Sequence, residues 1–178
     1  CSIVIPCYNE AGNLPGLLAG FGAALKAGDI ELILVDNGST DGTAALLRSA
    51  AADFPFFRAV TCERNLGYGG GILAGLRTAK VRCAGWTHGD MQYAPADILA
   101  AAESLRPFTQ EKIFLKGLRG NRTAVDRFFT AGMSLFASLT LGLRLEDINA
   151  QPTFFTRSLS ESWTTPPTDF SLDLYAYA

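Results

Sequence analysis

The chain has 178 residues, of which 48% are hydrophobic and 18% are charged. This composition is too apolar for a disordered segment and is typical of one folded domain with a sizeable core. Fifteen Lys and Arg residues against seventeen Asp and Glu residues give a net charge of −2, which excludes a strongly basic nucleic-acid-binding protein. Because the sequence has no run long enough to span a membrane, no secretory signal and four cysteines without metal or redox spacing, we expect a soluble cytoplasmic protein.

Short β-branched apolar runs alternate with helical periodicity along the first part of the chain. Strands are predicted at 2–6, 31–36, 57–61, 83–87 and 113–116, and helices at 14–25, 43–52, 72–79 and 97–105. The glycine-rich stretch Gly67–Gly71 is predicted to be a loop before the third helix. Near-continuous apolar strands that alternate with helices are typical of a parallel sheet covered on both faces. We therefore predict an α/β fold with a mostly parallel central sheet.

The pattern changes after residue 116, where four cations lie within twelve residues: Lys116, Arg119, Arg122 and Arg127. They either bind phosphate or form a solvated helix face. A helix is predicted at 125–141, a strand at 153–157 and a turn-rich linker at 163–169. The sequence starts inside an expected strand and stops inside an apolar run, so we expect truncation at both ends.

Ligands of parallel sheets bind beyond the carboxyl ends of the strands. Four polar segments would share that rim: Tyr8-Asn9-Glu10, Asp36-Asn37, Glu63-Arg64-Asn65 and His88-Gly89-Asp90. His88, Asp90 and Gln92 occupy alternate positions and could together hold a divalent cation. The alternative is that Asp90 caps the following helix. Asp41 is expected to hold a turn or cap a helix.

The glycines around Gly69 could bring backbone N–H groups close to a phosphate. They follow the third predicted strand instead of the first, which disfavours a dinucleotide-dependent oxidoreductase. His88 is the only histidine, and no Gly-x-Ser-x-Gly motif accompanies it, which disfavours a hydrolase.

Four motifs then occur in an informative order: Pro6-Cys7-Tyr8-Asn9-Glu10, Val35 to Thr43, Arg64-Asn65-Leu66-Gly67 and Gly89-Asp90-Met91-Gln92. Together they resemble the ordered motifs of glycosyltransferase family 2, which implies a single GT-A (Rossmann-like) domain. Three later segments resemble the polyprenyl-phosphate branch of that family, the dolichyl-phosphate mannose synthase type: Lys116-Gly117-Leu118-Arg119, Asp147 to Pro152 and Asp169 to Asp173.

The resemblance implies a domain over 1–178, with a nucleotide-sugar-binding part at 1–115 and an acceptor-binding part at 116–178. The residues implied to bind the nucleotide sugar are Pro6, Tyr8, Glu10, Asp36, Asn65 and Gly69. Those implied to hold Mn²⁺ or Mg²⁺ are His88, Asp90 and Gln92. Asp90 and Asp147 are the implied catalytic residues. The residues implied to hold the acceptor phosphate are Lys116, Arg119, Arg122 and Arg127.

Two positions depart from the family pattern, which usually has aspartate where this chain has Asn37 and His88. We expect Asn37 only to alter base contacts. His88 removes one carboxylate from the metal site, which is expected to alter metal affinity and to favour Mn²⁺.

The function implied is inverting transfer of a hexose from a UDP- or GDP-sugar to a polyprenyl (dolichyl or undecaprenyl) phosphate. The phenylalanine-rich segment after the cations is either core or a contact with another subunit or with lipid, which would place the protein at the inner face of the membrane. One alternative is a hydroxyl acceptor such as a glycan, with Asp147 as the base and Asp169 and Asp173 as further candidates. Another is a nucleotide-sugar-binding module without catalysis.

Overall fold

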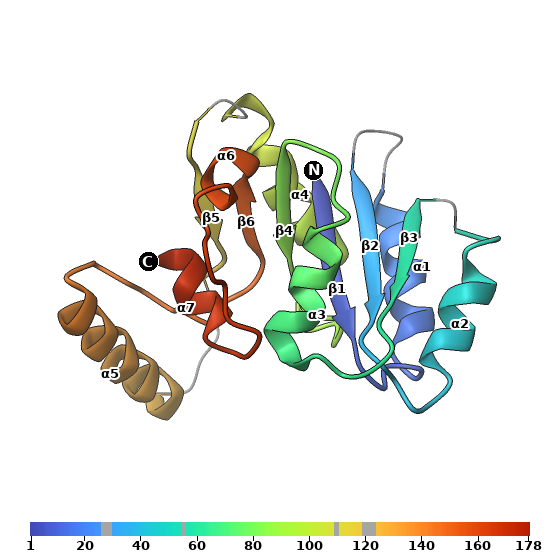
Figure 1. Cartoon of the computed structure of the whole chain (residues 1–178), viewed down its shortest axis with the longest axis horizontal. Helices are drawn as coiled ribbons and strands as arrows, with labels where there is room; N and C mark the ends of the chain where they lie inside the picture. The colour runs from blue at the N-terminus through green and yellow to red at the C-terminus, as the bar shows by residue number, and fades with distance from the viewer. Residues whose placement is uncertain (26–29, 55, 109–110, 119–123) are drawn as a thin grey trace.

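The computed structural model describes residues 1–25, 30–54, 56–108, 111–118 and 124–178, and within 124–130 it describes the helical backbone only. Six strands of these residues form one sheet in the order β3-β2-β1-β4-β6-β5 (Figure 1). The strands are β1 (Ser2–Cys7), β2 (Glu31–Asp36), β3 (Phe57–Thr61), β4 (Cys83–Trp86), β5 (Phe114–Lys116) and β6 (Thr153–Thr156). Strands β1 to β4 pair in parallel, whereas β6 is antiparallel to both β4 and β5. The prediction of a mostly parallel α/β sheet is confirmed.

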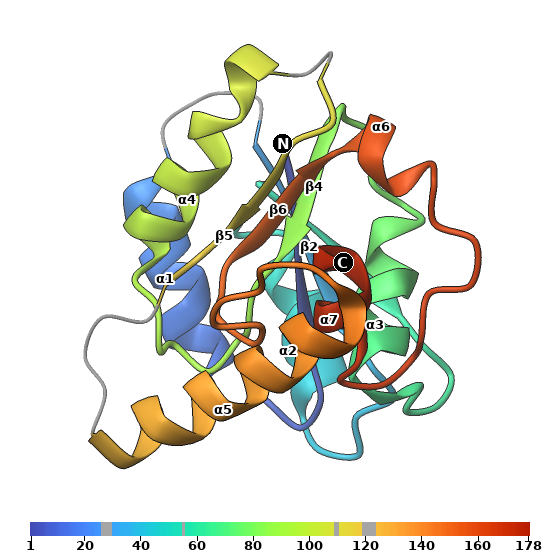
Figure 2. The ribbon, with the colours of Figure 1, turned by 90° about the vertical axis from the view of Figure 1, so that its left-hand side faces the viewer.

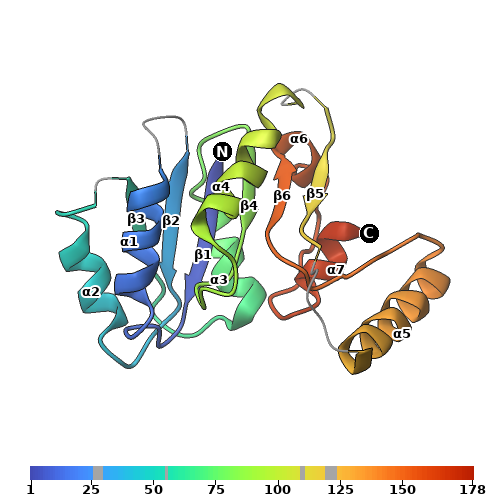
Figure 3. The same cartoon turned by 180° about the vertical axis from the view of Figure 1, so that it is seen from behind.

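Helices cover both faces of the sheet, as predicted. They are α1 (Leu14–Ala24), α2 (Thr43–Ala50), α3 (Gly67–Leu76), α4 (Pro95–Ser104), α5 (Ala124–Leu141), α6 (Arg157–Ser160) and α7 (Leu172–Tyr177). Helices α1, α2 and α4 lie on one face (Figure 3), and α3 lies on the other (Figure 2). The two short helices α6 and α7 were not predicted, because segments of four and six residues carry too little periodicity to be recognised.

The alternation of side chains along β1 explains why the two faces have separate cores. Ile3 and Ile5 point to one face and pack in a buried cluster with residues of α1 and α4. Val4 points to the other face and packs in a second cluster with Ile72 of α3 and Leu172 of α7. Each fully buried aliphatic side chain of this kind contributes about 1.5–3 kcal/mol. Because β1 is packed on both faces, the position of the loop that follows it is well defined.

The prediction of a loop at Gly67–Gly71 is wrong, because α3 already begins at Gly67. The glycines allow the first turns of α3 to lie directly against the backbone of 167–169. A Cβ atom on Gly67, whose φ is +80°, would come within 2.7 Å of the Thr168 carbonyl oxygen. A Cβ atom on Gly69 would come equally close to the Pro167 carbonyl oxygen. The glycine run is thus needed for close packing and not for an open loop.

Helix α5 extends away from the sheet at the edge of the molecule (Figures 1 and 3). Leu135, Phe136 and Leu139 expose 61%, 71% and 75% of their surface, whereas Ala137 is buried. Among the helices that the structure describes, none is long and apolar enough to cross a membrane. The helix therefore presents an uncovered apolar face beside the sheet.

Candidate functional site

A cavity of about 430 Å³ opens at the carboxyl ends of β1, β2 and β4, and we refer to it as the rim pocket. It is lined by Pro6, Tyr8, Glu10, Asn37, Asn65, Gly67, Tyr68, His88, Gly89, Asp90 and Phe170. The lining draws on the segments that follow β1, β2, β3 and β4, as the parallel topology requires. One residue, Phe170, comes from the segment before α7.

Six of the predicted site residues line the rim pocket: Pro6, Tyr8, Glu10, Asn65, His88 and Asp90. Asp36, Gly69 and Gln92 lie outside this lining. Asp36 is buried beneath it, with 3% of its surface exposed, and Gly69 packs against 167–169. The sequence analysis missed Tyr68 and Phe170 as site residues, because no local motif connects an aromatic residue of α3 with one a hundred residues later.

Hydrogen bonds between side chains and backbone join the loops that follow β1 and β2. The Glu10 N–H donates to Thr43 Oγ1 at 2.9 Å, and the Thr40 N–H donates to Asn9 Oδ1 at 2.9 Å. Asp41 accepts from the Ala11 N–H at 3.2 Å and from the Thr43 N–H at 2.9 Å. The hydrogen bonds from Thr43 lower the pKa of Asp41. Asp41 thus holds the turn before α2, as predicted, and these bonds connect the loops that follow β1 and β2.

Asn37 connects the loop after β2 to the loop after β3. Its Oδ1 accepts from the Leu66 N–H at 3.0 Å, while its Nδ2 donates to Asn65 Oδ1 at 3.2 Å and to the Gly67 carbonyl at 3.0 Å. An aspartate has no donor for the last two bonds. The expectation that Asn37 only alters base contacts is therefore incomplete, because this buried amide also holds the start of α3.

His88 and Asp90 are the predicted metal ligands that face the rim pocket. The His88 ring stacks on Tyr68 with centroids 5.5 Å apart, and Asp90 is exposed. The Gln92 N–H donates to Asp90 Oδ1 at 3.2 Å, which orients the carboxylate. In the described ranges, no group of three or more His, Cys, Asp and Glu side chains could hold a metal by itself. The carboxylate of Asp90 and the imidazole of His88 both line the rim pocket, and both are groups that can bind a divalent cation.

Lys116, predicted to hold the acceptor phosphate, lies in a buried ion pair. Its Nζ is 2.9 Å from Asp173 Oδ1 and donates to Thr153 Oγ1 at 2.8 Å. The two charged side chains are 5% and 3% exposed. Tyr68 donates to the other oxygen of Asp173 at 2.9 Å. Burial, followed by the charge of Asp173, raises the pKa of Tyr68.

The other predicted acceptor residues are less fully placed. Arg119 and Arg122 lie outside the described residues, and Arg127 lies in the part of α5 whose side chains are not described. Asp147 lies in the loop between α5 and β6, where its φ is +45° and its carbonyl accepts from the Ala150 N–H at 2.8 Å. Its catalytic role remains a prediction.

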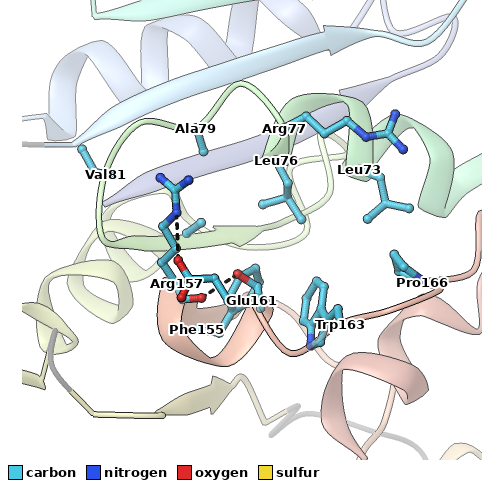
Figure 4. Close-up of a pocket in the computed structure, with 12 residues that line it drawn as sticks. Leu73, Leu76, Arg77, Ala79, Val81, Phe155, Arg157, Glu161, Trp163 and Pro166 are labelled. Atoms are coloured by element: carbon cyan, nitrogen blue, oxygen red, sulfur yellow. Dashed lines mark hydrogen bonds and ion pairs between the residues drawn. The ribbon is translucent and has the colours of Figure 1, made fainter.

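Two further cavities differ from the rim pocket in character. One, of about 310 Å³, lies between α3 and the segment around α6 (Figure 4). Leu76, Phe155 and Trp163 line it, and its described lining contains no predicted site residue. The other, of about 320 Å³, lies between α5 and α7, and we refer to it as the α5 groove. Phe170 lines both the α5 groove and the rim pocket, so the two adjoin.

The ordered motifs of this rim agree with a known family. The family model described as "Glycosyl transferase family 2" matches residues 2–108, which include all four motifs. The chain belongs to glycosyltransferase family 2. This membership confirms the resemblance noted in the sequence. It covers β1 to β4 and the rim pocket except for Phe170.

Curated relatives within family 2 share a polyprenyl-phosphate substrate in their names. One is the undecaprenyl-phosphate 4-deoxy-4-formamido-L-arabinose transferase of Pseudomonas fluorescens (strain Pf0-1). It is 34% identical over 168 residues, which cover 90% of this chain and 48% of the relative. The chain therefore spans about half the length of the curated relatives that it matches over most of its sequence.

Solved structures of glycosyltransferases share the fold. One is the mannosyltransferase PcManGT from Pyrobaculum calidifontis, in complex with GDP-Man and Mn²⁺, with a TM-score of 0.70 and 23% sequence identity. The match covers 97% of this chain and 48% of the mannosyltransferase chain. A glucosyl-3-phosphoglycerate synthase from Mycobacterium tuberculosis, in complex with Mn²⁺, UDP and phosphoglyceric acid, has a TM-score of 0.74 and 19% identity. That match covers 99% of this chain and 62% of the synthase chain. The expectation of a GT-A fold is confirmed.

Proposed function

We propose that this family 2 protein transfers a hexose or related sugar from a UDP- or GDP-sugar to a polyprenyl phosphate, with inversion at the anomeric carbon. The observation that carries the proposal is the rim pocket, which gathers residues from the segments after four strands. The names of the curated relatives support undecaprenyl phosphate as the acceptor.

The nucleotide sugar is proposed to lie in the rim pocket, with its base toward Tyr8 and Glu10 and its diphosphate toward Asp90. Asp36, buried below the pocket, accepts from the Ser39 N–H at 3.0 Å and so fixes the backbone at the end of β2. Asn65 and Asn37 shape the wall after β3. The loops that form this pocket are already joined by hydrogen bonds, so binding requires little reorganisation.

His88 and Asp90 are proposed to hold Mn²⁺ or Mg²⁺, with Gln92 as a further candidate ligand. When bound, such an ion offsets the negative charge that develops on the leaving diphosphate. The imidazole of His88 favours Mn²⁺ over Mg²⁺, because Mg²⁺ takes oxygen ligands almost exclusively. Solved neighbours that contain Mn²⁺ support a divalent ion.

The acceptor is proposed to approach from the side of the α5 groove. Its phosphate would be held by the arginines predicted for that role, Arg119, Arg122 and Arg127. Lys116 is left out of this set, because its side chain is buried in the ion pair with Asp173. A phosphate is already anionic near neutral pH, so no base is needed. A hydroxyl acceptor would need one, and Asp147 is the candidate. The exposed apolar face of α5 supports a peripheral location at the cytoplasmic face of a membrane.

Sugar transfer with defined donors and acceptors tests the proposal. The protein is incubated with Mn²⁺, a panel of UDP- and GDP-sugars that includes both nucleotide forms of 4-deoxy-4-formamido-L-arabinose, and either undecaprenyl phosphate or an oligosaccharide. We expect glycolipid product with at least one donor and none with the oligosaccharide. Product on the oligosaccharide alone would establish the hydroxyl acceptor instead. Nucleotide binding without turnover of any donor would establish a binding module.

A further inference from the structure

We infer that the buried ion pair of Lys116 and Asp173 positions Tyr68, and that the Tyr68 ring in turn orients the donor in the rim pocket. The inference rests on the proposed function, because it takes the rim pocket as the donor site. Asp173 and Lys116 are positioning residues that act through Tyr68, and they lie outside the pocket lining.

The Tyr68 ring stacks with two other rings of the rim pocket. It stacks with Phe170 at a centroid distance of 4.6 Å and an interplanar angle of 14°, and with His88 at 5.5 Å and 25°. Aromatic pairs in such geometries are worth about 0.5–1.5 kcal/mol beyond their buried area. Tyr68 therefore contacts both the His88 imidazole and the Phe170 ring, which also lines the α5 groove.

The hydroxyl of Tyr68 is held from below by a fully buried carboxylate. Asp173 is 2% exposed and accepts from Tyr68 at 2.9 Å, from Lys116 at 2.9 Å and from Gln151 Nε2 at 3.1 Å. Gln151 Nε2 also donates to the Tyr68 oxygen at 3.2 Å. A buried charge is tolerated only when it is paired and hydrogen-bonded, so this carboxylate has little freedom to move. Its partners restrict the Tyr68 ring to one orientation.

These contacts connect the two parts of the chain. Tyr68 and His88 belong to the part at 1–115, whereas Lys116, Phe170 and Asp173 belong to the part at 116–178. The shape of the donor pocket thus depends on residues outside the 2–108 segment that matches the family model. Removing the Tyr68 hydroxyl should loosen the ring and weaken donor binding without removing any group that the reaction uses.

The test is Tyr68→Phe, which keeps the ring and deletes both the bond to Asp173 and the bond from Gln151. Its matched control is Tyr175→Phe, which deletes a hydroxyl that accepts from the Thr164 N–H at 3.1 Å near Trp163, outside the rim pocket lining. We expect Tyr68→Phe to raise the donor KM, and the Kd of UDP or GDP with Mn²⁺, about tenfold, with kcat and the acceptor KM within about twofold of wild type. Tyr175→Phe should leave all of these values unchanged.

A structural role alone would lower the unfolding midpoint of Tyr68→Phe but leave its donor KM at the wild-type value, and that result would overturn the inference. If Tyr68→Phe does not fold, Phe170→Leu takes its place, because Phe170 is 71% exposed and its loss spares the core. We expect Phe170→Leu to raise the donor KM about threefold, and an unchanged KM would overturn the inference. Wild-type protein that binds neither UDP nor GDP would overturn the proposed function as well.

Discussion

The parts at 1–115 and 116–178 contribute to the rim pocket in different ways. In the first part, parallel strands with buried side chains end in short polar motifs, and local hydrogen bonds such as that from Thr40 to Asn9 hold these motifs. In the second part, Lys116 at the end of β5 forms a buried ion pair with Asp173 of α7 and donates to Thr153 at the start of β6. The bond between Tyr68 and Asp173 spans 105 positions of sequence. The first part therefore supplies every residue of the rim-pocket lining except Phe170, and the second part holds the hydroxyl of Tyr68 through Asp173.

Two ion pairs of the second part differ in how far they are buried. The pair of Lys116 and Asp173 is almost completely buried, whereas Arg144 and Glu146 are 90% and 58% exposed at a similar distance of 2.9 Å. Breaking a buried pair leaves an uncompensated charge, but an exposed pair is replaced by water. The two pairs have the same distance between their charged atoms, but mutation of the buried pair is expected to lower the free energy of unfolding more than mutation of the exposed pair.

The largest effect is expected from Asp90→Asn, which tests the chemical contribution of the first part. Loss of the proposed metal carboxylate should lower kcat about 10³-fold, as for other groups that stabilise developing charge. The unfolding midpoint should stay unchanged, because Asp90 is exposed. Initial rates with saturating donor and Mn²⁺ measure this, with Asp53→Asn as a control on another exposed carboxylate. Activity within tenfold of wild type would contradict the assignment of Asp90.

The next effect concerns the buried centre of the second part. Lys116→Met should lower the free energy of unfolding by about 3 kcal/mol, the lower end for a broken buried pair because Tyr68 and Gln151 still donate to Asp173. Urea denaturation measures the difference. Glu146→Gln, which breaks the exposed pair, should change the free energy of unfolding by less than about 1 kcal/mol. Similar losses in the two variants would remove the contrast between buried and exposed pairs.

Asn37→Asp tests whether an amide is required where the family usually has a carboxylate. The change removes the donors to Asn65 and Gly67 and places a second charge beside the buried Asp36, so we expect a loss of about 2 kcal/mol. Thermal unfolding measures the change, and the donor KM shows whether the pocket wall moves. An unchanged unfolding midpoint would contradict the structural role of the Asn37 amide and would leave only its expected contact with the base.

The smallest effect is expected at Asp41, which holds the rim at the surface. The pKa of Asp41 in the folded state lies below the ordinary value of 3.8. At a pH above the pKa of the unfolded state, ionised Asp41 therefore stabilises the folded state. That contribution is lost as the pH falls through the lowered folded pKa. In Asp41→Asn, the unfolding midpoint should therefore fall less steeply than in wild type as the pH is lowered through the unfolded and then the folded pKa of Asp41. Parallel pH profiles would show that the hydrogen bonds from Thr43 and Ala11 contribute nothing.

The sequence predicted the elements of the first part well because its signals are local. The strand at 31–36 and the strand at 57–61 have the predicted bounds, since each is a short apolar run between polar turns. The glycine-rich stretch was mistaken for a loop, because glycine favours loops unless another segment packs against it. The contact of Gly69 with the Pro167 carbonyl is such a case.

By itself, the sequence determined the family, the mostly parallel sheet and six residues of the rim pocket, including Glu10 and Asp90. These follow from periodicity and from motifs whose residues are neighbours in the chain. Only the tertiary structure showed that Tyr68 and Phe170 line the pocket and that Lys116 is paired with Asp173. The physical reason is that a buried charge is satisfied by whatever partners the fold brings within hydrogen-bonding distance, and no local pattern in the sequence records them.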